Sequence, residues 1–309
     1  METMNTPRLL VIGGTGFIGH HLLKSVQQKG WQMTSVSLNS PTKERFVDGT
    51  HYLHFDMVDQ SLVKKHLDKD FDYIVNLGGY INHKLFKDGG RQLIDTHFTT
   101  LQNMLEILPR RKLKRFVQIG SSDEYGNTKA AQHEGLREQP ISPYSLAKVA
   151  STHFLQMSYC TEGFPSVILR LFLTYGPGQD MGRFLPQIIR GCLDNATFPT
   201  STGEQLRDFC YIDDSVGAIL KALEVSEAEG EVFNVASGVP VSIRRMIEKV
   251  CELTGSGNPQ YGDVPYRPGE NMALYANISK AKNILKWEPT TTLDEGLQKT
   301  IDWYTKNHA

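Results

Sequence analysis

A tyrosine and a lysine four residues apart are the first side chains in this sequence that could act together in catalysis. Tyr144 and Lys148, in the segment YSLAK, share one face of a predicted helix from Pro143 to Glu162, because residues four apart on a helix are neighbours. Ser142 is expected to cap this helix and Gly163 to end it. The ammonium is expected to lower the pKa of Tyr144, so that the tyrosine can exchange a proton with a hydroxyl during hydride transfer.

Ser121 adds a hydroxyl at the end of a predicted strand from Arg115 to Gly120. The carboxyl ends of parallel strands border the crevice where ligands bind, so Ser121 is expected to donate to the same substrate oxygen as Tyr144. A tyrosine and a lysine at this spacing occur by chance on many helices, and a strand-end serine often satisfies only local backbone. Together with a glycine-rich turn near the N-terminus, the three residues form a more specific pattern.

The glycine-rich turn, GGTGFIG, follows the first predicted strand and opens the first predicted helix. Gly13 allows a tight turn, Gly16 lets backbone amides approach a pyrophosphate, and Gly19 lets the helix pack closely on the strand. The helix N-terminus adds a positive partial charge. This placement predicts a dinucleotide cofactor, and a plain strand-to-helix turn is the alternative. The cofactor-binding residues expected in this segment are Gly13, Thr15, Gly16, Phe17, Ile18 and Gly19.

The end of the second strand bears on which nicotinamide cofactor is used. NAD-binding chains usually carry an acid about 20 residues beyond the turn, bound to the ribose 2′-hydroxyl, but Asn39 stands there. A neutral residue with Lys43 or Arg45 nearby favours NADP over NAD. In the alternative, Asn39 hydrogen-bonds the ribose of NAD and both cations are solvated. Asp56 is assigned to the cofactor adenine, with a helix N-cap as its other interpretation.

Short apolar strands alternate with helical patterns, which predicts βαβ units and a parallel sheet. We therefore predict an α/β fold: a Rossmann doubly wound parallel sheet with a smaller C-terminal α/β substrate-binding lobe. Strands are expected at Arg8 to Gly13, Gln32 to Leu38, His51 to Phe55, Phe71 to Leu77, Arg115 to Gly120, Ser166 to Leu173 and Glu231 to Ala236. Further helices are expected at Phe17 to Lys29, Arg91 to Leu108, Leu185 to Leu193, Ile212 to Leu223, Ile278 to Leu285 and Leu293 to Tyr304.

Two lobes are expected, with a cleft between them. The cofactor domain is assigned to residues 1–172 with about 212–238, and the substrate lobe to about 173–211 and 239–309. No Pro-, Gly- or Ser-rich linker separates the two parts, so we expect them to pack together.

The composition excludes several classes of protein. The 309 residues are 39% hydrophobic and 22% charged with net charge −1, which gives no electrostatic drive toward nucleic acid or an anionic membrane. No apolar run is long enough to span a bilayer, no signal peptide is recognised, and the four cysteines form no CxxC pair, so a cytoplasmic protein with reduced thiols is expected. No spacing suggests a metal. His83 and His133 could line the cleft, but a lone histidine is more often a surface or locally satisfied side chain, so neither is assigned to the site.

The motifs GGTGFIG, SSDEYG, YSLAK, LRLFLTYGPGQ, RDFCYIDD and RPGE together resemble the extended short-chain dehydrogenase/reductases, the epimerase/dehydratase group that acts on nucleotide sugars. The resemblance covers nearly the whole chain. It implies a Rossmann domain with a tightly bound nicotinamide cofactor, NADP or NAD. It also implies a nucleoside-diphosphate sugar in the cleft, and a homodimer formed through helices.

The resemblance assigns roles to individual residues. Ser121, Tyr144 and Lys148 match the catalytic triad, and the last two also contact the cofactor. Arg207 matches an arginine that contacts the sugar-nucleotide phosphates, and Arg267 in RPGE resembles a second one; the planar guanidinium of an arginine suits a diphosphate. Ser122, Asp123 and Arg183 complete the expected substrate-binding set. The chain departs from the family at two places, with Leu173 and Thr96 where asparagines often stand.

The segment SSDEYG bears on the reaction. Family dehydratases carry Thr-Asp-Glu with the threonine four residues before the tyrosine of YG; here that position is Ser121, so Asp123 and Glu124 are displaced by one. A one-residue shift on an extended segment turns side chains to the other face, which argues against a dehydratase. The motif is similar to that of NDP-4-keto-6-deoxyhexose 4-reductases, and it predicts NAD(P)H-dependent reduction at C4 in deoxysugar biosynthesis.

Two alternatives to the reductase stay open. An NDP-hexose 4-epimerase with tightly bound NAD uses the same triad. A non-catalytic Rossmann protein that senses a dinucleotide is the alternative of another class, although a sensor has no need of an ionisable tyrosine–lysine pair.

Overall fold

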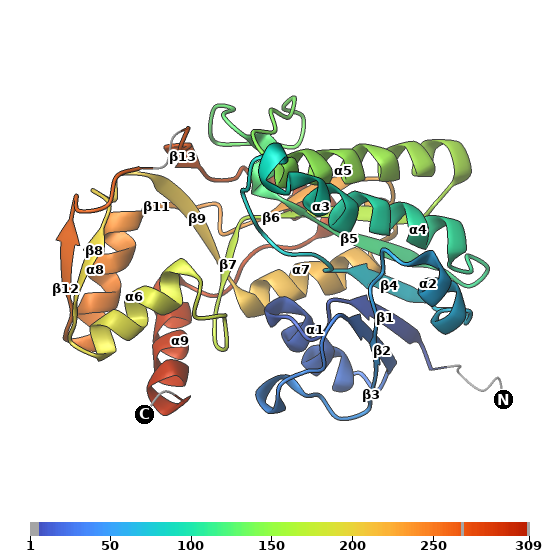
Figure 1. The fold of residues 1–309 in the computed structure, drawn as a ribbon, viewed down its shortest axis with the longest axis horizontal. Coiled ribbons are helices and arrows are strands. Elements are labelled where there is room, and N and C mark those ends of the chain that lie inside the picture. Colours follow the sequence, from blue (N-terminus) through green and yellow to red (C-terminus); the bar gives the residue numbers. More distant parts are fainter. Residues whose placement is uncertain (1–5, 267–268, 308–309) are drawn as a thin grey trace.

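A parallel sheet of seven strands forms the larger part of the computed structural model, which describes residues 6–266 and 269–307 (Figure 1). The strand order is β3-β2-β1-β4-β5-β6-β10, and every neighbouring pair is parallel. The predicted α/β Rossmann class is therefore confirmed. The strands are β1 (Arg8–Ile12), β2 (Gln32–Ser37), β3 (Thr50–His54), β4 (Tyr73–Asn76), β5 (Arg115–Ser121), β6 (Ser166–Leu171) and β10 (Val232–Val235).

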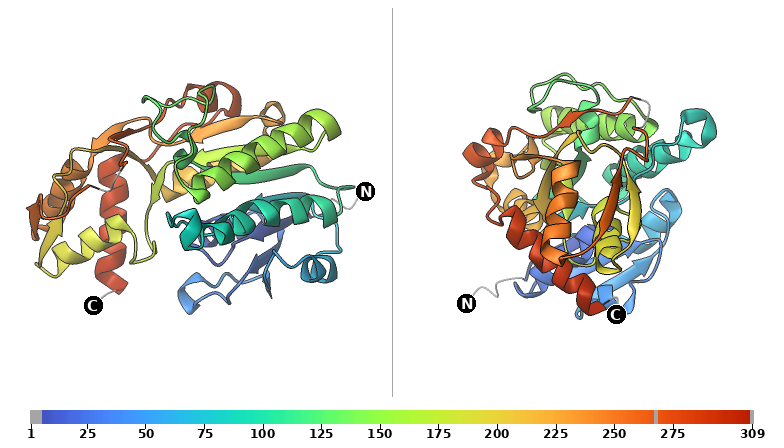
Figure 2. Two further views of the ribbon diagram at one scale, coloured as in Figure 1. Left: turned by 45° about the horizontal axis from the view of Figure 1, so that its top comes forward. Right: turned by 90° about the vertical axis from the view of Figure 1, so that its left-hand side faces the viewer.

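Helices cover both faces of this sheet (Figure 2). On one face, α1 (Phe17–Gln27) packs beside α7 (Ile212–Glu224); on the other, α3 (Gly90–Ile94) packs on α5 (Pro143–Glu162), and α2 (Gln60–His66) on α4 (Thr100–Ile107). Alternate side chains of β1 enter two separate cores, Leu9 and Val11 in one, Leu10 and Ile12 in the other. Burial on both faces explains the near-continuous apolar run of this strand.

The predicted helix from Arg91 to Leu108 is interrupted by a π-helical turn, η3 (Asp95–Thr99), between α3 and α4. Such turns admit one extra residue per turn and often accompany functional sites. By contrast, α5 has the predicted bounds, with Ser142 as its N-cap and Gly163 in a left-handed conformation at its end.

A smaller lobe follows β6 and lies beyond the carboxyl ends of the sheet strands (Figures 1 and 2). The predicted strand Ser166 to Leu173 stops at Leu171, and a new strand, β7 (Leu173–Tyr175), joins a second sheet instead. The other strands of the lobe are β8 (Thr197–Thr200), β9 (Leu206–Tyr211), β11 (Pro240–Ser242), β12 (Asn258–Tyr261) and β13 (Ala273–Leu274). Its helices are α6 (Phe184–Leu193), α8 (Ile243–Thr254) and α9 (Leu293–Asn307).

Helix α8 and the strands β8, β9 and β11 to β13 were not predicted. A signal for α8 was present, because Ile243, Met246, Ile247 and Val250 recur at helical spacing and are all buried. Strands β8, β11, β12 and β13 have two to four residues each, too few to show an alternating pattern. The remaining short helical turns are η1 (Lys43–Arg45), η2 (Phe86–Asp88), η4 (Ser122–Tyr125), η5 (Ser226–Ala228) and η6 (Ala281–Leu285).

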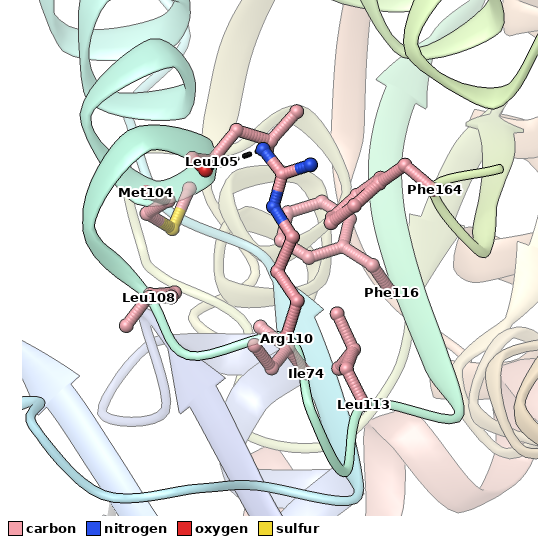
Figure 3. Close-up of a pocket in the computed structure, with 8 residues that line it drawn as sticks. All are labelled: Ile74, Met104, Leu105, Leu108, Arg110, Leu113, Phe116 and Phe164. Atoms are coloured by element: carbon pink, nitrogen blue, oxygen red, sulfur yellow. Dashed lines mark hydrogen bonds between the residues drawn. The ribbon is translucent and has the colours of Figure 1, made fainter. Parts of the chain in front are cut away.

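An apolar cavity of about 10 Å³ lies between α4 and the amino ends of β4 and β5 (Figure 3). The Arg110 side chain closes it, donating to the Leu105 carbonyl at 2.6 Å and lying over the Phe164 ring at 5.1 Å. The space is about that of one water molecule, so it is a packing defect rather than a ligand site. Within residues 6–266 and 269–307, no helix is long and apolar enough to cross a membrane.

The close packing of the first helix on the first strand should be sensitive to one methyl group. A Cβ on Gly19 would lie 2.3 Å from the Gly13 carbonyl oxygen and 2.6 Å from the Gly14 Cα, so backbone would have to move. We expect Gly19→Ala to lower the free energy of unfolding by about 1–3 kcal/mol, as overpacking typically does. Urea denaturation measures this. Gly182→Ala, where a Cβ meets nothing within 4 Å, is the control; equal stability of the two variants would contradict the prediction.

Candidate active site

The glycine turn has the geometry of an anion-binding loop. Gly13 has a positive φ of 81° and donates from its amide to the Val36 carbonyl at 2.7 Å, which fixes the turn against β2. Gly16 is the N-cap of α1 and offers no side chain to cap it, so the first amides of α1 point out of the turn. These residues fit the pyrophosphate of a nicotinamide dinucleotide. Thr15, Phe17 and Ile18 complete the turn, and the Thr15 amide donates to the Ser37 hydroxyl at 3.3 Å.

The end of β2 differs from the sequence expectation in one respect. Asn39 and Lys43 are exposed, but Arg45 is committed elsewhere: its guanidinium pairs with Asp180 at 2.7 Å and donates to the Gly178 carbonyl at 2.8 Å. Arg45 thus binds the loop before α6, so an NADP preference would depend on Asn39 and Lys43.

Asp56 is exposed just after β3, where its carboxylate accepts from the Val58 amide at 3.0 Å. The alternative interpretation of Asp56 as a helix N-cap is wrong. Asp59 caps α2 instead, accepting from the Ser61 and Leu62 amides. Asp56 lies three residues before the N-cap Asp59, too far from the first amides of α2 to accept from them.

The structure brings Ser121, Tyr144 and Lys148 together at the carboxyl end of β5. The Ser121 hydroxyl accepts from the Asp123 amide at 3.2 Å and lies close enough to the Tyr144 phenol to act against the rise in its pKa. The Lys148 ammonium donates to the Ile119 carbonyl at 2.7 Å and lies 5.9 Å from the centre of the Tyr144 ring. All three side chains are buried. A substrate hydroxyl placed against Ser121 and Tyr144 would meet two hydrogen-bonding groups.

The pKa of Tyr144 is shifted opposite to the sequence expectation. Burial raises the pKa of the phenol above its ordinary value, and the negative charge of Asp123 raises it further. Burial also lowers the pKa of Lys148 to about 8, while the Glu124 charge opposes that shift. The lysine is too far away and too desolvated to offset burial, so Tyr144 is held in the protonated form, the form of a proton donor.

Two histidines that sequence analysis did not assign to the site flank the ring of Tyr144. His97, in the π-helical turn, lies edge-on to this ring, with 5.1 Å between the two ring centres. His83, in the loop after β4, is also edge-on, with 6.1 Å between the ring centres. His97 donates from Nε2 to the Tyr80 carbonyl at 3.0 Å, and burial lowers its pKa to about 3. In the sequence, the only sign that His97 belongs to the site was its place as a lone histidine in an otherwise amphipathic predicted helix.

Glu124 is fully buried and each of its oxygens is bonded. One carboxylate oxygen accepts from the Ser121 amide at 2.9 Å. The other accepts from Arg170 Nε at 2.9 Å and from the Thr152 hydroxyl at 2.8 Å. Arg170 also pairs with Glu138 at 2.5 Å. Glu124 therefore joins β5, α5 and β6 and is not directed at a substrate.

Asp123, the residue before Glu124, does face the site, because its charge acts on Tyr144. Burial raises the pKa of its carboxyl, while the charges of His83 and Arg207 lower it. Its nearest ionisable partner is His83, whose Nε2 lies 3.8 Å from Asp123 Oδ2. Arg207 on β9 is itself ion-paired with Glu270. The charge of Arg207 lowers the pKa of Asp123, and the charge of Glu270 raises it.

The other expected substrate residues are spread around this centre. Ser122 is buried directly after the catalytic strand, and Arg183 is exposed at the N-terminus of α6, near enough for its charge to act on Tyr144. Arg267 lies outside the described residues. Among the described residues, no cluster of three His, Cys, Asp or Glu side chains could hold a metal.

Comparison with known proteins places this geometry in a family. The family model described as "NAD dependent epimerase/dehydratase family" matches residues 9–236. The chain belongs to that family. A family described as NAD dependent agrees with the anion-binding geometry of the glycine turn.

Individual relatives are distant but collinear. The chain is 27% identical to "Low-salt glycan biosynthesis protein Agl12" of Haloferax volcanii, over 96% of this chain and 98% of that one. It is 26% identical to a dTDP-glucose 4,6-dehydratase of Streptomyces niveus, over 98% and 94%. A solved UDP-glucose 4-epimerase of Thermotoga maritima with UDP-glucose superposes with a TM-score of 0.88, at 26% identity, over 98% and 100%. None of these three is named as a 4-reductase.

The proton donor can be tested directly. Tyr144→Phe removes only the phenolic hydroxyl, and we expect turnover to fall by about 10²-fold or more, because general acid catalysis contributes that much. Steady-state turnover and thermal denaturation should be measured together. Tyr159→Phe is the matched control, because Tyr159 is an exposed tyrosine on the same helix. Near-normal turnover of Tyr144→Phe would contradict the assignment.

Proposed function

We propose that this protein is an NAD(P)H-dependent reductase that reduces an NDP-4-keto-6-deoxyhexose at C4 for deoxysugar biosynthesis. When bound, the nicotinamide supplies the hydride that C4 receives. Tyr144, held protonated by burial, donates a proton to the C4 oxygen, and Ser121 hydrogen-bonds to the same oxygen. Lys148 holds a position beside the Tyr144 ring and suits the ribose of the cofactor.

The observation that carries this proposal is the burial of Glu124. A 4,6-dehydratase needs an acid and a base beyond the triad, to remove the C5 proton and the C6 hydroxyl. Both carboxylate oxygens of Glu124 accept hydrogen bonds from Ser121, Arg170 and Thr152, so Glu124 is not available as that base. Reduction of a ketone that is already present needs no such group.

We propose NADP as the preferred cofactor. Asn39 places no negative charge at the end of β2, and exposed Lys43 is free to approach a 2′-phosphate. Because Arg45 is bonded to the loop before α6, the preference is expected to be modest.

We also propose a cytoplasmic homodimer. Helix α5 keeps Leu146 and Met157 exposed, with partly buried Val149 and Ala150 between them. A second copy of this helix could cover that apolar stripe by a two-fold contact. The other partner is the nucleoside-diphosphate sugar itself.

The test is a spectrophotometric assay at the absorbance band of reduced nicotinamide. Purified enzyme is mixed with NADPH or NADH and a panel of dTDP-, GDP-, CDP- and UDP-linked 4-keto-6-deoxyhexoses. Stoichiometric loss of the reduced cofactor with one of them supports the reductase. No oxidation, together with copurifying NAD and interconversion of an unmodified NDP-hexose, would favour the epimerase instead. No turnover of any sugar, with binding of the dinucleotide, would favour the sensor.

The cofactor preference has a test of its own. Asn39→Asp places a carboxylate where a 2′-phosphate would lie, and we expect the ratio of kcat/KM for NADPH over NADH to fall by about tenfold or more, which corresponds to about 1.4 kcal/mol. Asn283→Asp adds a carboxylate at an exposed position on η6 and should leave the ratio unchanged. An unchanged ratio in Asn39→Asp would contradict NADP binding at this position.

A further inference from the structure

Two cysteines that are 59 positions apart in the sequence are in contact in the smaller lobe. The Sγ atom of Cys192, in the last turn of α6, lies 3.5 Å from the Sγ atom of Cys251 on α8. Both are free thiols. Of the other two cysteines, Cys160 is exposed on α5, and Cys210 is buried on β9, where its thiol donates to the Tyr211 carbonyl at 3.8 Å. The fold thus creates a thiol pair that the spacing in the sequence does not show.

The surrounding backbone holds this pair in place. Helices α6 and α8 pack on each other, and the strands that follow them, β8 and β12, pair in parallel. At the ends of the two helices, the Ser256 hydroxyl donates to the Cys192 carbonyl at 2.5 Å, and the Asn258 amide donates to the Ala196 carbonyl at 3.0 Å. A Cβ on Gly257 would lie 2.6 Å from Cys192 Sγ, so the turn after α8 closes directly on the thiol. The contact between the sulfurs is therefore part of the packing of the lobe.

The two thiols differ in their access to solvent. Cys192 is buried, and burial raises the pKa of its thiol to about 12, so this thiol stays protonated near neutral pH. Cys251 is only partly buried, so a small oxidant can reach its sulfur from solvent. Thiols that are oxidised reversibly combine an accessible sulfur with a neighbouring cysteine that resolves the product. Cys251 and Cys192 have these two positions, whereas the exposed thiol of Cys160 has no such neighbour among the contacts described above.

We propose that Cys192 and Cys251 are a modification site, at which a peroxide forms a reversible disulfide that fixes α6 to α8. A disulfide bond is about 2.05 Å long, so the sulfurs must approach each other by about 1.5 Å, which rotation of the two side chains can provide. The inference does not depend on the reaction that the protein catalyses, because neither cysteine belongs to the site around Tyr144.

The oxidation balances with hydrogen peroxide as the oxidant. The Cys251 sulfur attacks one peroxide oxygen: an S–O bond forms, the O–O bond breaks, and the leaving hydroxide takes the thiol proton and becomes water. The Cys192 sulfur then attacks the Cys251 sulfur: the S–S bond forms, the S–O bond breaks, and the oxygen leaves as a second water with the Cys192 proton. The two sulfurs lose two electrons and the peroxide gains them. A dithiol returns two electrons and two protons and restores both thiols.

Peptide mapping of the full chain tests the site. The reduced protein is freed of reductant, treated with hydrogen peroxide, alkylated with iodoacetamide and digested with trypsin without reduction. Trypsin cuts at Arg207, which lies between the two cysteines, so we expect two different peptides joined through Cys192 and Cys251. The intact monomer should be lighter by two hydrogen atoms, and dithiothreitol should reverse the change. Two unlinked thiols, a Cys251 oxidised only to its sulfinic acid, or a link only between two copies through Cys160 would each overturn the proposal.

The disulfide should also stabilise the fold. It closes a long loop that includes β8, β9 and β11, and so restricts the unfolded chain. We expect the oxidised protein to unfold at a temperature about 2 °C or more above that of the reduced protein, measured by thermal denaturation. An equal or lower unfolding temperature would contradict the fixing of α6 to α8.

Two variants assign the effect to this pair. Cys251→Ser removes the accessible sulfur, so peroxide should give neither the internal disulfide nor the rise in unfolding temperature. Cys160→Ser is the matched control, because Cys160 is an exposed cysteine outside the pair, and this variant should form the disulfide as the unchanged protein does. Thermal denaturation under reducing conditions shows that each variant folds; if Cys251→Ser does not, the peptide map of the unchanged protein decides alone. An internal disulfide that still forms in Cys251→Ser, or one lost in Cys160→Ser, would overturn the assignment.

Discussion

Glu124 is the side chain on which the geometry of the active site depends. It is a buried carboxylate that accepts from the Ser121 amide, from Thr152 on α5 and from Arg170 on β6. Those three contacts tie the end of the catalytic strand to the helix that carries Tyr144 and Lys148. A buried charge of this kind is costly unless every oxygen is paired, and removing one partner from such a pair typically costs about 3–5 kcal/mol. Glu124 thus supports the position of Ser121 and of the helix that carries Tyr144 and Lys148.

Burial is the second constraint, because it determines which proton each group holds. It raises the pKa of Tyr144, lowers that of Lys148 to about 8 and lowers that of His97 to about 3. Each shift favours the uncharged form, as desolvation requires. The result is a neutral, protonated tyrosine beside a neutral histidine, which suits donation to a ketone oxygen. Asp123 and His83 lie at the edge of this region, where their side chains face each other at 3.8 Å and are both partly exposed.

The two lobes meet at the loop that leads into α6. Arg45 from the cofactor side binds Gly178 and Asp180, His21 on α1 contacts the Pro177 carbonyl at 2.9 Å, and Tyr304 on α9 donates to the Gln179 carbonyl. These contacts link the end of β2 and the first helix to the loop that precedes Arg183. The position of Arg183, a predicted substrate-binding residue, is therefore connected to the part of the molecule that carries the glycine turn.

The sequence by itself determined the elements whose signals are local. The apolar run of β1, the glycines at 13, 16 and 19, and the capped helix α5 are each specified by residues close together in the chain, and the structure has them where they were predicted. The grouping of Ser121 with Tyr144 and Lys148 followed from the same patterns, because parallel strands end on one edge.

Only the tertiary structure decided what depends on neighbours distant in the chain. Glu124 has a structural role because it binds Arg170, which lies 46 positions away in the chain. Arg45, which was predicted to lie near the cofactor, binds Asp180, 135 positions away. His97 and His83 joined Tyr144 through a π-helical turn and a loop that no periodicity marks. The pKa of Tyr144 moved opposite to expectation for the same reason. Spacing in the sequence shows which charges are near, but the depth of burial, which dominates the shift, is set by the whole fold.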